Sequence, residues 1–461
     1  MASSSPSSTP PYKLTATAAA SAIRANTLTV TAYAHSLLSH IKSRNAAVKA
    51  WAHLDEASVL AQAAQLDSIP AEERGPLHGV SIGVKDIIYT KDMPTEHGSG
   101  IYAGVRPGVD AGSIMVLREA GALILGKTAT TEFAATVEGP GTRNPHCEKR
   151  MGRTPGGSSS GSGAAVADFQ VAISLGTQTA GSVIRPASFN GVYAMKPTWG
   201  AVTRDGQKVY SLALDTLGWY ARSVADLELV AGVLGIQDDD DDDDDGQDDE
   251  TKQTKLDLNG AKFGFVKTVV WDEHVEPGTE AATAKAIALL RSHGAEVEEM
   301  ELPEEAREIP TWHSALLAHD GKTSFLPEYR LAKSQLSASL VSQVEDQSPR
   351  SSHAAYLEAL DGIAAARPAV DRVLSKYAAV LTPSVPGEAP VGMKTGSPVF
   401  NLIWTSLHVP VVNMPGFGGE HGMPIGVSLV APRFHDRRLL RVCEAVGQVF
   451  EAEGGWKTQL G

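Results

Sequence analysis

Two serines lie in dense clusters of glycine and serine, where a hydroxyl group could act as a nucleophile. The stretch from Gly152 to Pro197 contains both clusters, Gly156–Gly163 with Ser158 and Thr177–Ser182 with Ser182 at its end. Glycines this dense occur where a backbone bends sharply or approaches a ligand closely. An apolar run between the two clusters argues against a flexible linker.

A serine nucleophile needs a base and a group that stabilises the developing oxyanion. The chain has 14 histidines, but none lies in a recognisable triad motif, and Ser182 is not at the centre of a G-x-S-x-G elbow. A lysine can act as the base when it is neutral, and burial favours its neutral form. A phosphate-binding turn is the other chemistry open to such glycines, but no G-K-[ST] follows them here.

Three segments of this sequence resemble the amidase signature family of serine hydrolases. They are GGSSSGSGAAV at Gly156–Val166, GTQTAGSVIRPASFNGVYAMKPT at Gly176–Thr198 and GVKDI at Gly83–Ile87. The resemblance is strong over 75–226, moderate over 378–450 and weak elsewhere. It implies an α/β fold with a large mixed central β-sheet that has helices on both faces.

The resemblance also implies a catalytic triad. Ser182 would be the nucleophile, Ser158 would relay its proton, and Lys85 would be the neutral base. Without the resemblance, a lysine at the end of a strand would be interpreted as a solvent-exposed residue that caps the strand. The family pattern further implies a cis peptide bond between Gly157 and Ser158, and an oxyanion hole formed by the N–H groups of four residues. These four are Thr179, Ala180, Gly181 and Ser182.

This sequence departs from the common family form G-[ST]-D-T-G-G-S-I-R, since it reads GTQTAGSVIR. Gln178 replaces an acid, Ala180 replaces a glycine, and Arg185 falls three residues after the nucleophile instead of two. These changes indicate a subgroup distinct from the glutamine-hydrolysing subunits of tRNA amidotransferases. Arg185, Gly157 and Ser159 are candidates for contacting the substrate or supporting the loop.

The leading functional interpretation is an amidohydrolase that cleaves a carboxylic amide, a carbamate or an aryl amide through a serine acyl-enzyme. The first alternative is the amidase subunit of a tRNA-dependent amidotransferase. The second is a catalytically silent binding protein on the same fold. The expected partner is a small-molecule amide or carbamate, and the acyl group, the leaving group and a homodimeric state stay open.

Apolar runs predict the strands that must position these residues. Gly79–Val84 and Val171–Leu175 predict short buried strands, and Lys85 comes directly after the first. GALILGKT at Gly121–Thr128 fits the P-loop expression G-x-x-x-x-G-K-[ST]. Its Ala-Leu-Ile-Leu segment predicts a buried strand where a P-loop needs an open turn, so we expect no nucleotide site there.

Helices are predicted on both sides of these strands. Thr29 could cap a helix, since the residues after it are apolar at helical spacing, and a second helix is expected at about Ser58–Leu66. The segment Pro303–Pro368 is helical and polar, and we expect substrate-contacting residues in it. The alternation of strands and helices indicates an α/β layered architecture.

Composition narrows the classes of function. Eleven acidic residues between Asp238 and Glu250 account for most of the formal net charge of −14, and no basic patch suggests nucleic-acid binding. Cys147 and Cys443 lie far apart with no C-x-x-C motif, so neither a disulfide framework nor a zinc site is expected. No apolar span has the length of a membrane helix. We therefore expect a cytoplasmic protein that binds no nucleic acid or membrane. The mechanism that the resemblance implies needs no metal or organic cofactor.

The domain organisation follows from the same patterns. Residues 1–11 are polar and rich in proline and serine, and we expect them to be disordered. Residues 12–461 are expected to form one amidase domain. Like-charge repulsion predicts an extended, disordered acidic insertion at 237–254. We expect the acidic run 238–250 within it to be dispensable.

Overall fold

A mixed β-sheet of eleven strands runs through the protein. The computed structural model describes residues 9–147, 152–238 and 256–460. The strands are β1 (Trp51–Leu54), β2 (Ser81–Lys85), β3 (Leu123–Thr128), β4 (Ile173–Gln178), β5 (Tyr193–Lys196), β6 (Thr216–Ala221), β7 (Lys262–Val266), β8 (Glu296–Met300), β9 (Ala379–Pro383), β10 (Val411–Gly418) and β11 (Pro424–Val430). Their order across the sheet is β1-β3-β2-β4-β6-β5-β10-β11-β9-β7-β8.

The pairing of β2, β4 and β6 places their ends at one edge of the sheet. β2 and β4 are parallel, with Val84 opposite Leu175, so both strands finish at the same edge. β6 is antiparallel to β4, with Thr216 opposite Gln178, and it therefore starts at that edge. The register brings the end of β2, the end of β4 and the start of β6 together.

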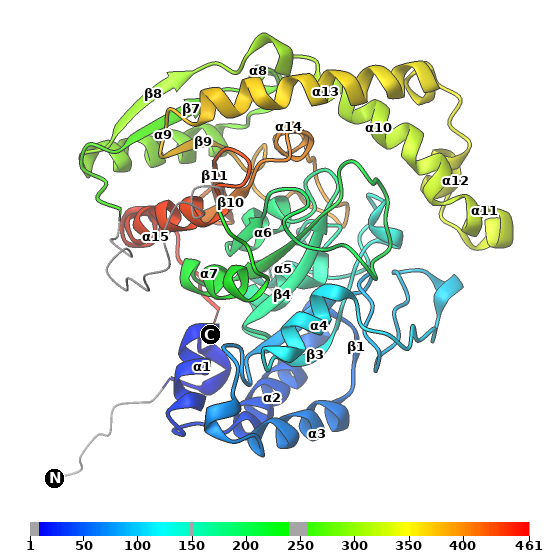
Figure 1. Ribbon diagram of the computed structural model, residues 1–461, viewed down its shortest axis with the longest axis vertical. Coiled ribbons are helices and arrows are strands. Elements are labelled where there is room, and N and C mark those ends of the chain that lie inside the picture. The colour runs from blue at the N-terminus through cyan, green and yellow to red at the C-terminus, as the bar shows by residue number, and fades with distance from the viewer. Residues whose placement is uncertain (1–8, 148–151, 239–255, 461) are drawn as a thin grey trace.

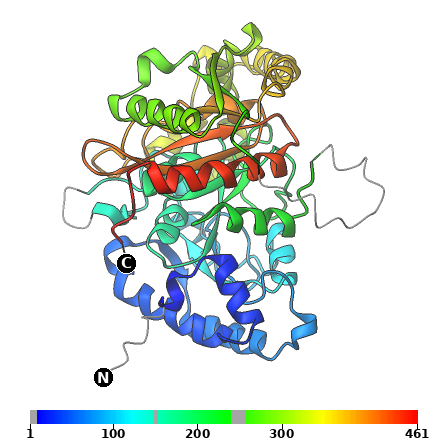
Figure 2. The ribbon, with the colours of Figure 1, turned by 90° about the vertical axis from the view of Figure 1, so that its left-hand side faces the viewer.

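Helices cover both faces of the sheet (Figures 1 and 2). Successive residues of β3 show the two faces, because Leu123 and Leu125 pack in one hydrophobic cluster and Ile124 in another. The helices are α1 (Ala16–Arg24), α2 (Val30–Val48), α3 (Glu56–Asp67), α4 (Gly112–Glu119), α5 (Ser160–Ala167), α6 (Ile184–Asn190), α7 (Val224–Val233), α8 (Trp271–His274), α9 (Pro277–Ser292), α10 (Ile309–Ser324), α11 (Leu326–Ala332), α12 (Ala338–Val344), α13 (His353–Leu374), α14 (Leu402–Ser406) and α15 (Asp436–Glu453).

The two clusters assign the main helices to faces. Helices α4, α7, α9 and α15 contribute to the cluster of Ile124, whereas α2, α5, α6, α10, α13 and α14 contribute to the cluster of Leu123. Helices α10–α13 lie at one end of the molecule and α1–α3 at the other (Figure 1). This arrangement confirms the predicted α/β fold with a large mixed sheet.

Several predicted elements are confirmed with shifted boundaries. Helix α2 begins directly after Thr29, whose side chain accepts a hydrogen bond from the Ala32 N–H, and α3 covers the predicted Ser58–Leu66. Lys85 is the last residue of β2, not the residue after it. Strand β4 starts later than predicted and runs to Gln178, because its pairing with β6 extends to that residue.

The segment Gly121–Thr128 contains a strand, as predicted, and not a phosphate-binding loop. All residues of β3 are buried. The Lys127 Nζ donates to the Ile88 carbonyl and to Thr95 Oγ1, both at 2.6 Å. A lysine engaged in this way inside the sheet cannot reach a phosphate.

The first turn of the described chain begins at residue 11, the last residue of the segment predicted to be disordered. Pro11 starts a 3-10 turn, Pro11–Lys13, and the Tyr12 N–H donates to Ser36 Oγ at 3.2 Å. The boundary of the folded chain therefore comes earlier than residue 12. Residues 1–8 lie outside the described part. Within that part, we find no helix with both the length and the apolar character needed to cross a membrane.

The prediction that the whole aspartate run is disordered and solvated is wrong for its first residue, Asp238. Asp238 is 6% exposed, and its two carboxylate oxygens accept hydrogen bonds from the N–H groups of Arg437 and Arg438, both at 2.7 Å. These donors belong to the first turn of α15, where a helix leaves its N–H groups unpaired and favours negative charge. Residues 239–255, which hold the rest of the run, lie outside the described part of the chain.

Candidate active site

Lys85 and Ser158 meet at the edge where β2 and β4 end. The Lys85 side chain is fully buried, and its Nζ lies 2.7 Å from Ser158 Oγ. The same nitrogen donates to Thr177 Oγ1 at 2.8 Å and lies 3.4 Å from the Thr177 carbonyl. Among the described residues, no carboxylate is within ion-pair distance of Lys85.

This environment favours a neutral lysine. Burial holds the pKa of Lys85 well below its ordinary value of 10.5, and the charge of Arg185 lowers this pKa further, whereas Asp215 partly opposes the shift. A neutral amine has two N–H groups and one lone pair. It can donate to both oxygens of Thr177 and still accept the hydroxyl proton of Ser158.

Ser158 lies in a turn that leads directly into α5. The peptide bond between Gly157 and Ser158 is cis, as the resemblance implies. The Ser158 carbonyl accepts hydrogen bonds from the N–H groups of Ser160 and Thr131, at 2.9 and 3.3 Å. A Cβ on Gly157 would lie 2.4 Å from the methyl group of Thr395, so a larger residue would clash there.

Ser159 braces the turn against β4 and does not contact the lysine. Its Oγ donates to the Thr177 carbonyl and accepts from the Thr177 N–H, each at 3.3 Å. A Cβ on Gly176, the residue before Thr177 in β4, would lie 3.2 Å from the Cβ of Ser159, so a side chain has no room there. The Ser158 turn is therefore pinned to the strand that leads to Ser182.

Residues 179–182 form a loop between β4 and α6. In the described part of the chain, the N–H groups of Thr179, Ala180, Gly181 and Ser182 donate to no protein acceptor. Two of their carbonyl groups accept hydrogen bonds: the Ala180 carbonyl from Thr405 Oγ1 at 2.7 Å, and the Ser182 carbonyl from the Tyr220 hydroxyl at 3.1 Å. Because a trans peptide sets C=O and the next N–H on opposite sides, the Thr405 contact also orients the Gly181 N–H.

Gln178, the last residue of β4, holds this loop in place through its side-chain amide. Its Oε1 accepts from the N–H groups of Val183 and Ile184, at 2.9 and 3.0 Å. Its Nε2 donates to Thr405 Oγ1 at 3.0 Å, and that hydroxyl donates to the Ala180 carbonyl. The amide thus starts a relay from Gln178 through Thr405 to Ala180, which an ionised acid could not start because it has no donor.

Asp215 holds the loop from the side of β6. The side chain is buried, and it accepts from Thr179 Oγ1 at 2.7 Å and from the Tyr210 N–H at 2.8 Å. Burial raises the pKa of Asp215 to about 6, although these hydrogen bonds pull it down. At neutral pH the carboxylate is ionised and brings a negative charge near Lys85.

Arg185 connects the two glycine and serine clusters. It is 4% exposed, its Nη1 donates to the Gly396 carbonyl at 3.0 Å, and its Nη2 donates to the Gly157 carbonyl. Of the two roles considered for this residue, these contacts support the one of holding the backbone. They tie the Ser158 turn to the helix that follows Ser182.

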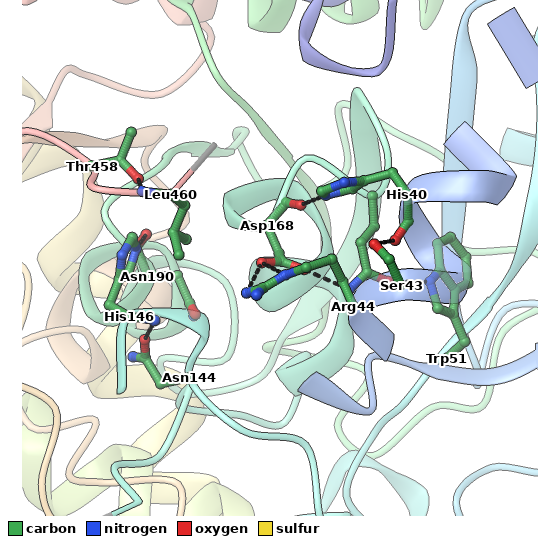
Figure 3. Close-up of polar contacts among 11 residues, drawn as sticks. His40, Ser43, Arg44, Trp51, Asn144, His146, Asp168, Asn190, Thr458 and Leu460 are labelled. Carbon is green, nitrogen blue, oxygen red and sulfur yellow. Dashed lines mark hydrogen bonds and ion pairs between the residues drawn. The ribbon is translucent and has the colours of Figure 1, made fainter. Parts of the chain in front are cut away.

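The far ends of α5 and α6 are anchored by side chains from other elements (Figure 3). Arg44 from α2 forms an ion pair with Asp168, one residue past α5, at 2.6 Å. His146 Nε2 lies 2.9 Å from the carbonyl of Asn190, the last residue of α6. α5 begins two residues after Ser158 and α6 begins two residues after Ser182, so these contacts hold the far ends of the helices that follow the two serines.

Sequence reasoning missed Thr177, Thr405 and Tyr220. Thr177 lies between the predicted strand and Ser182, and its position in the second glycine and serine cluster could have indicated it. Thr405 lies 227 residues from Gln178 along the chain and Tyr220 lies 38 residues from Ser182. Neither lies in a motif, and only the packing of α14 and β6 brings them to the loop.

A cavity of about 460 Å³ adjoins the Ser158 turn. Its lining includes Thr130, Thr131 and Ser337, and Thr131 is one of the two residues whose N–H groups donate to the Ser158 carbonyl. In the part of the chain that the structure describes, no group of three or more His, Cys, Asp or Glu residues could hold a metal ion.

A family profile described as Amidase matches residues 32–440. The chain belongs to the amidase family. This amidase is accordingly a hydrolase of carbon–nitrogen bonds other than peptide bonds. It is 32% identical to a glutamyl-tRNA(Gln) amidotransferase subunit of Chloroflexus aggregans, over 97% of this chain and 98% of the relative.

Solved structures give the same picture of the fold. The peptide amidase of Stenotrophomonas maltophilia is 26% identical to this amidase, with a TM-score of 0.78 over 95% of this chain and 96% of that one. A protein from a vestigial complex related to the origins of an s-triazine catabolic enzyme is also 26% identical, with a TM-score of 0.81 over 96% and 99%.

Proposed function

We propose that this amidase cleaves a carboxylic amide through an acyl-enzyme on Ser182, with Ser158 and Lys85 as its proton relay. The observation that carries the proposal is the fully buried Lys85 Nζ at 2.7 Å from Ser158 Oγ, without a contacting acid. A neutral amine in that place can take the Ser158 proton while Ser158 takes the proton of Ser182.

The reaction proceeds in two steps. Ser182 Oγ attacks the carbonyl carbon, its proton passes through Ser158 to Lys85, and the relay returns a proton to the leaving nitrogen as the C–N bond breaks. Water then attacks the ester carbonyl carbon and gives up a proton to the same relay, and the relay returns that proton to Ser182 Oγ as the ester C–O bond breaks and the carboxylic acid leaves. The unpaired N–H groups of residues 179–182 stabilise the oxyanion in both steps, and loss of one such donor typically costs ~10²–10³ in rate.

Substrate selection in this proposal belongs to the helical segment 303–368. Ser337 lines the cavity beside the Ser158 turn. A second cavity, of about 750 Å³, is lined by Leu317 and Val341 together with Tyr210, whose N–H donates to the carboxylate that holds Thr179. The proposed substrate is a small-molecule amide, and the proposed location is the cytoplasm.

The physiological role has two candidates. The sequence relatives favour an amidase subunit of a tRNA-dependent amidotransferase, because relatives named as glutamyl-tRNA(Gln) amidotransferase subunits are 30–32% identical over 90–97% of this chain. The departures Gln178 and Ala180 in the nucleophile loop favour a stand-alone amidase. The presence of Lys85, Ser158 and Ser182 speaks against a silent binding protein.

Ammonia release by the purified chain separates these candidates. The panel comprises L-glutamine, aliphatic amides, aryl amides and carbamates, with Ser182→Ala as the matched control. Turnover of simple amides by the lone chain, without glutaminase activity, supports a stand-alone amidase. Glutamine hydrolysis that needs added amidotransferase partner proteins supports the role in such a complex. Wild-type protein that behaves like Ser182→Ala on all substrates in both settings would contradict the enzymatic proposal.

A further inference from the structure

A further cavity of about 590 Å³ opens between α13 and the segment that leads to β6. No residue of the triad or of the loop 179–182 lines it. Its walls are mostly apolar, with Trp199, Leu316, Leu360 and Ile363 among them. Apolar walls with a few polar groups are typical of small-molecule sites.

The cavity carries positive charge and no negative charge. Its lining includes Arg367 and Arg433 but no aspartate or glutamate. Arg433 is paired with Asp371, at 2.7 Å from its Nε. Arg367 donates through Nε to the Ser406 carbonyl at 3.1 Å, and in the described part of the chain no carboxylate contacts it.

Arg367 therefore carries a positive charge beside the cavity with no carboxylate in contact with it, although the charge of Asp371 partly offsets it. Burial and the charge of Arg433 lower the pKa of Arg367 to about 10, so the guanidinium is still protonated at neutral pH. A partly buried cation is costly unless an anion or several acceptors pair with it.

His408 adds a second observation. Its Nε2 lies 2.9 Å from Arg367 Nη2 and 2.7 Å from the Ala213 carbonyl. Burial lowers the pKa of His408 to about 2, so the ring is neutral. A neutral Nε2 either accepts from the arginine or donates to the carbonyl, and it cannot do both. One of these two contacts therefore lacks a hydrogen bond, unless another acceptor receives the hydrogen bond from Arg367 Nη2.

We propose that this cavity binds a small organic carboxylate with an apolar body. The carboxylate accepts from the Arg367 guanidinium, whose planar fork suits two carboxylate oxygens. His408 is then free to donate to the Ala213 carbonyl. The apolar body fills the space between Leu360 and Trp199. This inference does not rest on the proposed function.

Calorimetric titration of the full chain with 4-phenylbutyrate tests the site, with 4-phenyl-1-butanol as the uncharged probe. Arg367→Met removes the charge, Leu360→Trp fills the cavity, and Arg330→Met is the matched control at an exposed arginine. We expect saturable binding by wild type and by Arg330→Met. Binding should weaken about tenfold or more for Arg367→Met and for the alcohol, since a hydrogen bond to a charged group is lost, and Leu360→Trp should abolish it.

The titration is repeated on Ser182→Ala, so that a ligand in the proposed active site is recognised. Equal affinity in Arg367→Met and wild type, or no saturable binding by wild type, would overturn the proposal. If Arg367→Met fails to fold, undiminished binding by Leu360→Trp would overturn it instead.

Discussion

Replacing Thr405 by valine should slow catalysis more than it weakens substrate binding. The side chain is fully buried, accepts from Gln178 Nε2 and donates to the Ala180 carbonyl at 2.7 Å. Valine has nearly the same shape but neither capacity. A buried polar group left unpaired costs ~1–3 kcal/mol. If that cost falls on the orientation of the Gly181 N–H in the transition state, kcat drops roughly 5- to 150-fold.

The assay is steady-state kinetics with the best amide of the panel, together with the affinity of a trifluoromethyl ketone that forms an oxyanion with the serine. We expect KM to change little, and the ketone to lose affinity by about the same factor as kcat/KM. Thr405→Ser keeps the hydroxyl and should stay near wild type. A kcat within about twofold of wild type for Thr405→Val, or an equal loss in Thr405→Ser, would refute the role of the hydrogen bonds that run from Gln178 through Thr405 to Ala180.

Three further predictions concern the charged groups of the site. Lys85→Met should abolish turnover. The melting temperature of this variant relative to wild type should rise as pH falls below 10.5, because in that range residue 85 of wild type holds a proton only in the unfolded chain. A difference in melting temperature that stays constant with pH would show that Lys85 is charged in the folded protein. Asp215→Asn removes a negative charge that raises the pKa of Lys85, so the acid limb of the kcat/KM profile should move to lower pH, and an unmoved limb would contradict this coupling. A lysine in Arg185→Lys cannot hold the Gly157 and Gly396 carbonyls in the same geometry. We therefore expect a lower melting temperature and an equal fall in kcat/KM for acidic and neutral amides. A loss confined to acidic amides would place Arg185 at the substrate.

Local patterns in the sequence predicted most of the elements that carry the site. The run before Lys85 and the run between the two clusters both became strands, and the helical spacing after Thr29 became α2. The shift of β4 to end at Gln178 was not predictable, because pairing with β6 sets that boundary. Strand limits depend on partners that lie elsewhere in the chain.

The support of the nucleophile loop was beyond sequence reasoning for the same reason. That Gln178 stands where the family has an acid is visible in the sequence, but its function depends on a hydroxyl of α14 that no motif marks. For the aspartate run, the sequence led to a prediction that the structure corrects. Its composition suggested one solvated segment, yet Asp238 is buried because the start of α15 offers two unpaired N–H groups.

Ser182 is the residue proposed to form the covalent intermediate. A serine-directed fluorophosphonate, followed by peptide mass spectrometry, tests this role most directly. We predict one adduct per chain, located on Ser182, no adduct in Ser182→Ala, and slower labelling in Lys85→Met because the relay has lost its base. Labelling of a different serine, or undiminished turnover by Ser182→Ala, would contradict the account.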